Sequence, residues 1–499
     1  MGSGICAIVL AAGEGKRLLS SKPKVIHNAA GKPLLGHVLS ALAPLELDEV
    51  VVVASARVDE IRSAVGDEEE VRFVVQDPPL GTGDAVKVGL GPLGPTRSVL
   101  VVPGDTPLLE TGTLQKMIDR HSSSGASATV LTARVSDPRG YGRITRDDTG
   151  GMSAIVEERD ATDDQRNIDE INGGVYVFDK DALIDCLDEV EKDNAQSEYY
   201  LTDVVGLLAA RGSKLATVTT DERETVGVNS RAQLAAASAL LRARICERWL
   251  DAGVTIVDPS VTYIDATVTI DNDATIQPFT FLEGTTHIGA GAEIGPQARI
   301  VDSHVDVGAT VSFAVIRGSR IGPDASVGPF ASLRPGTTLE RGARVGTFVE
   351  TKQTVLGEES KANHLAYLGD ATIGRGVNVG AGTITCNWDG RAKHETIIDD
   401  DAYIGSDTML VAPVHIGARG ATGAGSVVKG DVPPDSLAVG VPARVLPGRG
   451  NKMDRGPGTE GASEARRGPH VTGSGTEGAS EARRGPHVTG PRDEAGPER

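Results

Sequence analysis

The sequence has little cysteine: Cys6, Cys186, Cys246 and Cys386 are its four cysteines in 499 residues. They show no paired CxxC spacing and lack the density of a disulfide-stabilised scaffold. No apolar run reaches the length of a membrane span, and no charged leader with a cleavage pattern precedes the apolar residues 5–12. These absences favour a reduced, cytoplasmic protein that does not enter a membrane.

Positive charge is also in deficit. The chain has 69 Asp and Glu residues against 50 Lys and Arg, which gives a formal net charge of −19. Such a surface argues against nucleic acid and anionic membranes as partners, because little positive charge is available to neutralise phosphate over a large area. Anion binding must therefore depend on local basic residues.

What the sequence has instead is a six-residue period. An α-helix repeats apolar residues every three or four positions and a half-buried strand every two, so a period of six predicts a coil of short flat sides, each with one inward side chain. We expect residues 252–446 to form a parallel β-helix of hexapeptide type. The repeating positions are Ile264, Ile270 and Ile276; Ile288, Ile294 and Ile300; Ile321, Val327, Leu333, Leu339 and Val345; and Ile398, Ile404, Leu410 and Ile416, followed by Thr422.

The composition agrees with a narrow stacked coil. Aromatic residues make up only 3% of the chain, and 62 glycines are available for tight corners. Coils of this kind also occur as inert spacers, so the repeat predicts no catalysis. The register fails between Val345 and Ile373 and again between Ile384 and Ile398, and we expect both segments to leave the coil as surface loops.

The first 228 residues alternate strand-like and amphipathic segments. Strands are expected at 5–10, 49–53, 71–75 and 98–102, and helices at 33–45, 58–65 and 83–90. This order predicts an α/β domain with a Rossmann-like, mostly parallel sheet that binds ligands at the carboxyl ends of its strands. A linker helix is expected within 229–251. The tail 447–499 carries the segment GTEGASEARRGPHVTG twice and is expected to be disordered, because it has almost no aliphatic residue.

A glycine-rich loop follows the first expected strand. It reads LAAGEGKR from Leu10 to Arg17, and Lys22-Pro23-Lys24 comes shortly after. Backbone N–H groups of such a turn can approach a phosphate chain while Arg17 and Lys24 neutralise it. By itself the loop is weak evidence, because many α/β proteins use glycine for tight turns between strand and helix.

Further motifs agree with this loop and carry a family resemblance. The motifs of the N-terminal half are QDPPLGTGDA from Gln76, Pro103-Gly104-Asp105, GYGRI from Gly140, IVE ending at Glu157, EING from Glu170 and Gly227-Val228-Asn229. With the glycine-rich loop, they resemble sugar-1-phosphate nucleotidyltransferases. Taken together, they resemble the uridylyltransferase half of the bifunctional GlmU family. The segments SKANHLAYLGD, NVGAGTITCNWDG and AYIGSDT resemble its acetyltransferase half. The resemblance covers residues 5–446.

The resemblance implies two reactions. Glucosamine-1-phosphate is acetylated by acetyl-CoA on a left-handed β-helix, and the product is then uridylylated by UTP, with Mg²⁺, to UDP-N-acetylglucosamine for peptidoglycan and, in some bacteria, lipopolysaccharide. It also implies a homotrimer. In the uridylyltransferase half, the nucleotide would be held by Leu10, Ala11, Ala12, Gly13, Lys24, Gln76, Gly81 and Thr82. The amino sugar would be held by Gly142, Glu157, Asn172 and Asn229. Asp105 and Asn229 would bind the Mg²⁺, and Arg17 and Lys24 would bind the transferring phosphates.

In the acetyltransferase half, the resemblance implies that His364 is the catalytic base, which suits a side chain whose ordinary pKa lies near neutrality. Arg334 and Lys352 would grip the sugar phosphate, with Tyr367 and Asn378 on the sugar. Ala381, Asn387, Trp388, Ser406 and Ala424 would line the acetyl-CoA site.

Three positions depart from the family pattern. Lys16 adds a cation where a small hydroxylated residue is common, Trp388 replaces a tyrosine, and a coenzyme-binding arginine of some relatives is missing before Val441, with Arg444 as an open substitute. Two alternatives remain. A single-function nucleotidyltransferase with an oligomerising coil predicts no motif around His364, and a non-enzymatic trimeric scaffold predicts loss of Lys24, Asp105 or His364; all three are present.

Overall fold

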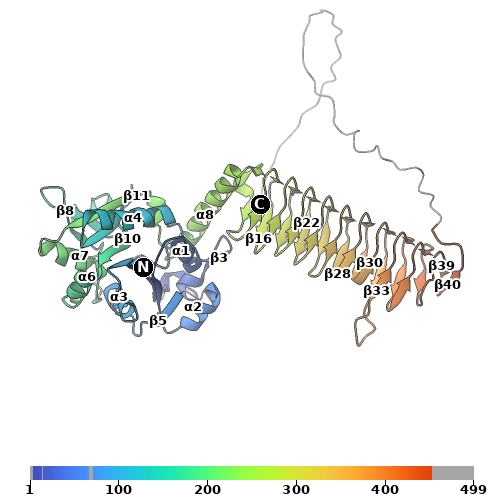
Figure 1. The fold of residues 1–499 in the computed structure, drawn as a ribbon, viewed down its shortest axis with the longest axis horizontal. Helices are drawn as coiled ribbons and strands as arrows, with labels where there is room; N and C mark the ends of the chain where they lie inside the picture. The colour runs from blue at the N-terminus through green and yellow to red at the C-terminus, as the bar shows by residue number, and fades with distance from the viewer. Residues whose placement is uncertain (1–3, 14, 67–70, 452–499) are drawn as a thin grey trace, which may run out of the picture. The chain divides into compact units, whose positions relative to one another are not determined.

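The computed structural model describes residues 4–13, 15–66 and 71–451. The strands and helices of its N-terminal part alternate as the sequence predicts (Figure 1). They are β1 (Ile5–Ala11), β2 (Asn28–Ala29), β3 (Lys32–Pro33), α1 (Leu34–Leu42), β4 (Glu49–Ala54), α2 (Val58–Val65), β5 (Val71–Val75), α3 (Thr82–Leu90), β6 (Ser98–Pro103), α4 (Thr111–Ser124), β7 (Ala128–Arg134), β8 (Arg143–Arg146), β9 (Met152–Val156), α5 (Asp163–Arg166), β10 (Glu170–Asp179), α6 (Lys180–Leu187), α7 (Leu201–Ala210) and β11 (Leu215–Thr220), with 3-10 turns η1 (Lys16–Leu18), η2 (Lys24–Ile26) and η3 (Glu222–Thr225).

These strands form a nine-stranded sheet whose main path is β11-β7-β10-β6-β1-β4-β5. The half that contains the four expected strands, β6-β1-β4-β5, is parallel throughout. The other half is mixed, because β10 runs antiparallel to β6 and β7, and β8 and β9 form a hairpin beside it. A short turn joins antiparallel strands, which accounts for the relative direction of β8 and β9.

Helices cover both faces of the sheet. Ile8 of β1 belongs to a buried cluster with residues of α3, α6 and α7, whereas its neighbours Ala7 and Val9 belong to a second cluster with α1 and α4. Successive side chains of a strand point to opposite faces. Because both faces are buried, the strands read as continuous apolar runs.

A single long helix, α8 (Arg231–Asp251), follows this domain. Ser230 caps it, since the Ser230 hydroxyl accepts the N–H of Gln233 at 3.2 Å. Ala237 and Leu241 pack with residues of the N-terminal domain, and Ile245 and Cys246 belong to the apolar interior of the coil that follows. The helix therefore joins two cores, as its predicted spacer role requires.

The coil is a parallel β-helix built from two long sheets (Figure 1). The twelve-stranded sheet contains β12 (Thr255–Ile256), β15 (Thr275–Ile276), β18 (Glu293–Ile294), β21 (Thr310–Val311), β24 (Ser326–Val327), β27 (Arg344–Thr347), β29 (Lys361–His364), β31 (Asn378–Val379), β34 (Tyr403–Ile404), β37 (Ala421–Thr422), β39 (Leu437–Gly440) and β40 (Ala443–Leu446). The seventeen-stranded sheet contains β13 (Tyr263–Ile264), β14 (Thr269–Ile270), β16 (Phe281–Glu283), β17 (His287–Ile288), β19 (Arg299–Val301), β20 (His304–Val305), β22 (Ala314–Arg317), β23 (Arg320–Ile321), β25 (Ala331–Leu333), β26 (Thr338–Leu339), β28 (Glu350–Leu356), β30 (Tyr367–Ile373), β32 (Ile384–Cys386), β33 (Thr396–Ile398), β35 (Met409–Val411), β36 (Val414–Ile416) and β38 (Val427–Val428). A 3-10 turn, η4 (Pro259–Val261), precedes β13.

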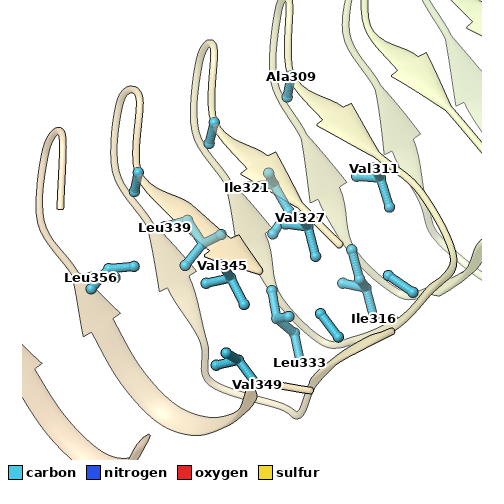
Figure 2. Close-up of a cluster of buried hydrophobic side chains, with 14 of the residues drawn as sticks. Ala309, Val311, Ile316, Ile321, Val327, Leu333, Leu339, Val345, Val349 and Leu356 are labelled. Atoms are coloured by element: carbon cyan, nitrogen blue, oxygen red, sulfur yellow. The ribbon is translucent and has the colours of Figure 1, made fainter. Parts of the chain in front are cut away.

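The predicted six-residue period marks the interior of this coil. The aliphatic side chains from Ile321 to Val345 point inward from successive sides of the coil (Figure 2), and none of the five repeating residues is more than 3% exposed. The earlier and later repeats, from Ile264 to Ile300 and from Ile398 to Thr422, are buried as well. The hexapeptide prediction is therefore confirmed.

The prediction that the first break in the period forms a surface loop is wrong. Residues 346–372 stay in the coil, and Thr351, Leu356, Ala362 and Leu368 are completely buried. The six-residue pattern was not recognised here because Thr351 stands where the repeat has an aliphatic residue. Its hydroxyl forms a hydrogen bond with the Thr337 hydroxyl at 3.0 Å inside the coil. In addition, β28 pairs with both β25 and β26, so it runs across two sides of the coil and shortens the spacing.

The second break does leave the coil. Residues 387–395 form a hairpin with an antiparallel bridge between Trp388 and Lys393, and Trp388 is 58% exposed. The predicted disorder of the tail concerns residues that lie outside the described part beyond Asn451. Across the described ranges, every helix is too short or too polar to span a bilayer.

Candidate active sites

The first candidate site lies where β1 and β6 end. The turn after β6 presents Asp105, whose carboxylate forms an ion pair with the Lys24 ammonium. Lys24 Nζ also donates to Asn229 Oδ1 at 3.0 Å, and the Val228 N–H holds that segment to the Asp105 carbonyl at 3.0 Å. The Lys24 and Asp105 side chains are only 13% and 14% exposed. The fold thus brings Asp105 and Asn229, which are distant in the sequence, to the ammonium of Lys24.

The glycine-rich loop wraps around Lys24. Gly15 adopts a φ of +62°, and a Cβ there would lie 2.7 Å from the Lys24 Cβ, so a larger residue would push Lys24 away. Before it, Ala11 and Ala12 are buried and Gly13 is exposed, and Leu10 is tied to the β6 turn by a bond from the Gly104 N–H at 2.9 Å. Arg17 lies exposed in η1, whereas the Lys16 side chain lies outside the described part.

The predicted nucleotide contacts gather at the end of β5 and the start of α3. Gln76 is 4% exposed, and its amide donates to the Gly81 carbonyl at 3.1 Å and to Asp84 Oδ2 at 2.7 Å. Thr82 accepts the N–H of Leu201 at 3.0 Å, which leaves its own O–H free to donate. The orientation of these polar groups is therefore set before any ligand binds.

The predicted amino-sugar contacts also meet. A Cβ on Gly142 would lie 3.5 Å from both the Asn172 Cβ and Glu157 Oε1, so the three residues line one narrow space. Asn172 is held by its donation to the Tyr176 hydroxyl at 2.6 Å. Burial raises the pKa of Glu157, against the lowering effect of the Thr202 hydroxyl that donates to it at 3.2 Å.

Arg143 is a residue of this site that the sequence analysis did not single out. It is completely buried, and its guanidinium pairs with Glu158 at 2.6 Å and donates to the carbonyls of Tyr141 and Arg166. It thereby ties together the segments that flank Gly142 and Glu157. The only sequence signal was an arginine inside the GYGRI motif, and its burial could not be read from that motif.

The second candidate site follows one corner of the β-helix. On successive turns this corner is a residue of positive φ, namely Leu365 (46°), Gly382 (75°), Asp407 (56°) and Gly425 (70°). Backbone bonds stack the corners: the N–H of Gly382 donates to Leu365, that of Asp407 to Ala381 and that of Gly425 to Ser406, at 2.6–3.0 Å. The residue before each corner is His364, Ala381, Ser406 and Ala424 respectively. Four predicted site residues therefore form one column, with His364 followed by small side chains.

Polar residues lie beside this column on the seventeen-stranded sheet. Lys352 of β28 is 3.5 Å from Asp370 Oδ1, and Asp370 also accepts the Asn387 amide, which lies 3.5 Å from the Tyr367 hydroxyl. A Cβ on Gly369 would lie 2.5 Å from that hydroxyl, so glycine leaves room for the group. The structure thus places Lys352, Tyr367 and Asn387 around Asp370, which the sequence analysis did not name. The roles expected of the three on the sugar phosphate, the sugar and acetyl-CoA stay predictions.

Two further cations surround Lys352. Arg334 follows β25, which pairs with β28, and its guanidinium forms an ion pair with Glu350 of β28 at 3.0 Å. The pKa of Lys393, in the hairpin 387–395, is lowered by the adjacent Lys352 and also by Arg334. Lys393 was not singled out from the sequence, because it lies in an irregular segment. Asn378 begins β31 on the twelve-stranded sheet, a different face from that of Lys352 and Tyr367.

Comparison with known proteins fits this pair of sites. A family model described as the MobA-like NTP transferase domain matches residues 7–194. "Bifunctional protein GlmU" of Heliobacterium modesticaldum is 48% identical over 435 residues, 87% of this chain and 94% of that protein. The proteins of the same name from Streptomyces avermitilis and Carboxydothermus hydrogenoformans are 48% and 46% identical, over 87% of this chain and 91% and 96% of their own lengths. The chain belongs to the GlmU family.

As a GlmU-family member, the protein is a bifunctional enzyme of UDP-N-acetylglucosamine biosynthesis, with an acetyltransferase and a metal-dependent uridylyltransferase activity that serve cell-wall synthesis. The family assignment excludes the single-function and scaffold alternatives. Arg444, the open substitute for the coenzyme-binding arginine, pairs with Val439 in the terminal hairpin of β39 and β40 and is exposed.

Proposed function

We propose that the N-terminal domain, residues 1–228, transfers uridylyl from UTP to N-acetylglucosamine-1-phosphate at the Lys24 site and that Mg²⁺ is its metal. The observation that carries this proposal is that Asp105 and Asn229 already direct two oxygens at one cation, the Lys24 ammonium. A carboxylate with a neutral amide oxygen suits Mg²⁺, which keeps several waters and uses few protein ligands. When bound, the ion would offset charge on the triphosphate.

The chain's own residues would align the reactants. The attacking sugar phosphate is already anionic at neutral pH, so no side-chain base is needed, and the protein supplies position and positive charge. The backbone of Leu10 to Gly13 would cradle the phosphates, with Arg17 and Lys24 as counter-charges. On either side of them, Gln76, Gly81 and Thr82 would hold the uridine, and Gly142, Glu157, Asn172 and Asn229 the amino sugar.

The β-helix, residues 252–446 after the linker 229–251, would transfer an acetyl group from acetyl-CoA to glucosamine-1-phosphate. The substrate ammonium must lose a proton before its nitrogen attacks the thioester carbonyl, and His364, exposed at the end of β29, would take that proton. The C–S bond then breaks and free thiol leaves. The column of Ala381, Ser406 and Ala424 would accommodate the extended acetyl donor, with Asn387 and Trp388 beside it.

The phosphate of glucosamine-1-phosphate would bind among Arg334, Lys352 and Lys393, with Tyr367 on the sugar. Asn378 lies on the other sheet and would reach the sugar from a neighbouring copy of the coil. Three cations that share one locality repel one another, and a dianionic phosphate removes that cost. Lys352 and Arg334 lower the pKa of Lys393, whereas Lys393 and Asp370 raise that of Lys352.

We also propose a cytoplasmic homotrimer formed by the β-helix. The corner column continues before Leu365 with Phe348, Phe330 and Phe313, all of positive φ, whose ring centroids are 5.5–5.7 Å apart. Phe330, Phe348 and Leu365 are 56%, 61% and 62% exposed. A stripe of large apolar side chains in a strained backbone conformation is best stabilised by burial against further copies of the coil, beside His364.

The experiment supplies purified protein with glucosamine-1-phosphate, acetyl-CoA, UTP and Mg²⁺ and follows thiol and pyrophosphate release. We expect both products from the wild type. His364→Ala should lose thiol release by about 10²–10⁴-fold, while pyrophosphate release from N-acetylglucosamine-1-phosphate stays intact. Coupled loss of both activities in a folded variant would contradict two independent sites.

A further inference from the structure

The hairpin 387–395 is largely exposed and is closed by bonds of its own. Its strands are joined by the bridge between Trp388 and Lys393 and by the donation of the His394 N–H to the Asn387 carbonyl at 2.9 Å. Gly390, at the tip, has a φ of +95°. Surface loops are usually more mobile than the elements they connect, so these bonds restrain a segment that would otherwise move.

Asp389 is the centre of these bonds. Its Oδ1 accepts the N–H groups of Arg391 and Ala392, each at 2.7 Å, and its Oδ2 accepts from His394 Nε2 at 2.7 Å. The Ala392 N–H, followed by His394, lowers the pKa of Asp389 to about 2, so the carboxylate stays ionised at neutral pH. One side chain therefore closes the hairpin across its width.

The residue that the closed hairpin presents is Lys393. It precedes His394, whose N–H donates to Asn387, and the Asn387 amide donates to Asp370, the partner of Lys352 at 3.5 Å. Lys352 and Arg334 lower the pKa of Lys393, and Asp370 raises it. Glu395, the other acidic residue of the hairpin, is engaged by the Thr372 hydroxyl at 2.6 Å on β30. Asp389 closes the hairpin that carries Lys393, which limits how far the backbone at Lys393 can move from these groups.

We propose that Asp389 and His394 form a clasp whose role is to position Lys393 for the phosphate of the amino-sugar substrate. The proposal rests on the proposed acetyltransferase function. Because the clasp restrains the hairpin before binding, phosphate need not order it, and the affinity gained is specific to phosphorylated substrate. Asp389 and His394 are positioning residues, since they act through Lys393.

The test measures acetyl transfer with varied glucosamine-1-phosphate for Asp389→Ala, His394→Ala, Lys393→Ala and the double variant Asp389→Ala/Lys393→Ala. His394→Gln is the matched control, because a glutamine amide can still donate to Asp389. Circular dichroism and the thermal transition report the folding of the β-helix in every variant, and uridylyl transfer from UTP to N-acetylglucosamine-1-phosphate reports the N-terminal domain.

We expect Asp389→Ala and His394→Ala to raise the KM for glucosamine-1-phosphate by about tenfold, the loss of roughly one charge-assisted contact, with kcat and the KM for acetyl-CoA unchanged. His394→Gln should retain most of the affinity. The double variant should equal Lys393→Ala, because the clasp acts only through that ammonium.

A wild-type KM in Asp389→Ala, a parallel fall in kcat, or full additivity with Lys393→Ala would each overturn the clasp. Absence of thiol release from the wild type would instead overturn the proposed acetyltransferase function, so the two failures are distinguishable.

Discussion

Replacing Arg143 by methionine should destabilise the N-terminal domain and weaken its recognition of the amino sugar. The side chain is 0% exposed, and Glu158, its partner at 2.6 Å, is 32% exposed. Removing one partner of a buried ion pair costs about 3–5 kcal/mol. Because Glu158 keeps some contact with water, we expect a value near the lower end, about 3 kcal/mol, or a fall in melting temperature of about 6–12 °C for a domain of this size.

The assay is thermal and urea unfolding of the full-length protein, with uridylyl transfer measured alongside. Arg139→Met is the matched control: Arg139 precedes the same motif and pairs with Asp137, but its side chain is 82% exposed, so its loss should cost less than about 1 kcal/mol. Arg143→Met should also raise the KM for N-acetylglucosamine-1-phosphate and leave acetyl transfer unchanged. Equal stability of the two variants would refute the reasoning, because burial is what separates them.

Three further predictions concern the two sites. Burial raises the pKa of Glu157 above its ordinary 4.5, so the folded state holds the proton more tightly and loses stability as pH rises through that interval; urea titrations should show Glu157→Gln gaining on the wild type as pH rises from about 4.5 and then levelling off, whereas a constant difference would contradict this. Phe348→Asp should dissociate the trimer in light scattering and abolish acetyl transfer but spare uridylyl transfer; a trimer that persists would show that the stripe is not the interface. Asp105→Asn should lower pyrophosphate release at least about tenfold, the cost of one charge-assisted contact, and raise the Mg²⁺ concentration needed, which a magnesium titration measures; an unchanged titration would argue against the metal role.

The predicted period was sufficient for most of the coil, because each inward residue depends only on its place in a short repeat. It failed where the interior position was Thr351, since a threonine is apolar enough to be buried yet carries no apolar signal in the sequence. The four strands and three helices that the sequence analysis expected in the N-terminal half were predicted within a few residues for the same local reason. The antiparallel β10 was not, because strand direction depends on distant pairing.

The candidate sites divide in the same way. Motifs alone pointed to Lys24, Asp105 and His364, and the structure shows that Lys24 and Asp105 share one ion pair with Asn229 beside them. Arg143 and Lys393 were missed, because their significance is burial in one case and a neighbouring charge in the other. Their roles, like those of the other site residues, stay predictions until the variants are measured.

By itself, the sequence determined the period of the coil, the order of the α/β half and the residue types available for each reaction, because all three are local or recur at fixed spacing. Only the tertiary structure decided that His364, Ala381, Ser406 and Ala424 form one column. The chain between them has unequal lengths, since the hairpin 387–395 is inserted between the second and the third, and only stacking of the turns through backbone bonds makes their positions equivalent.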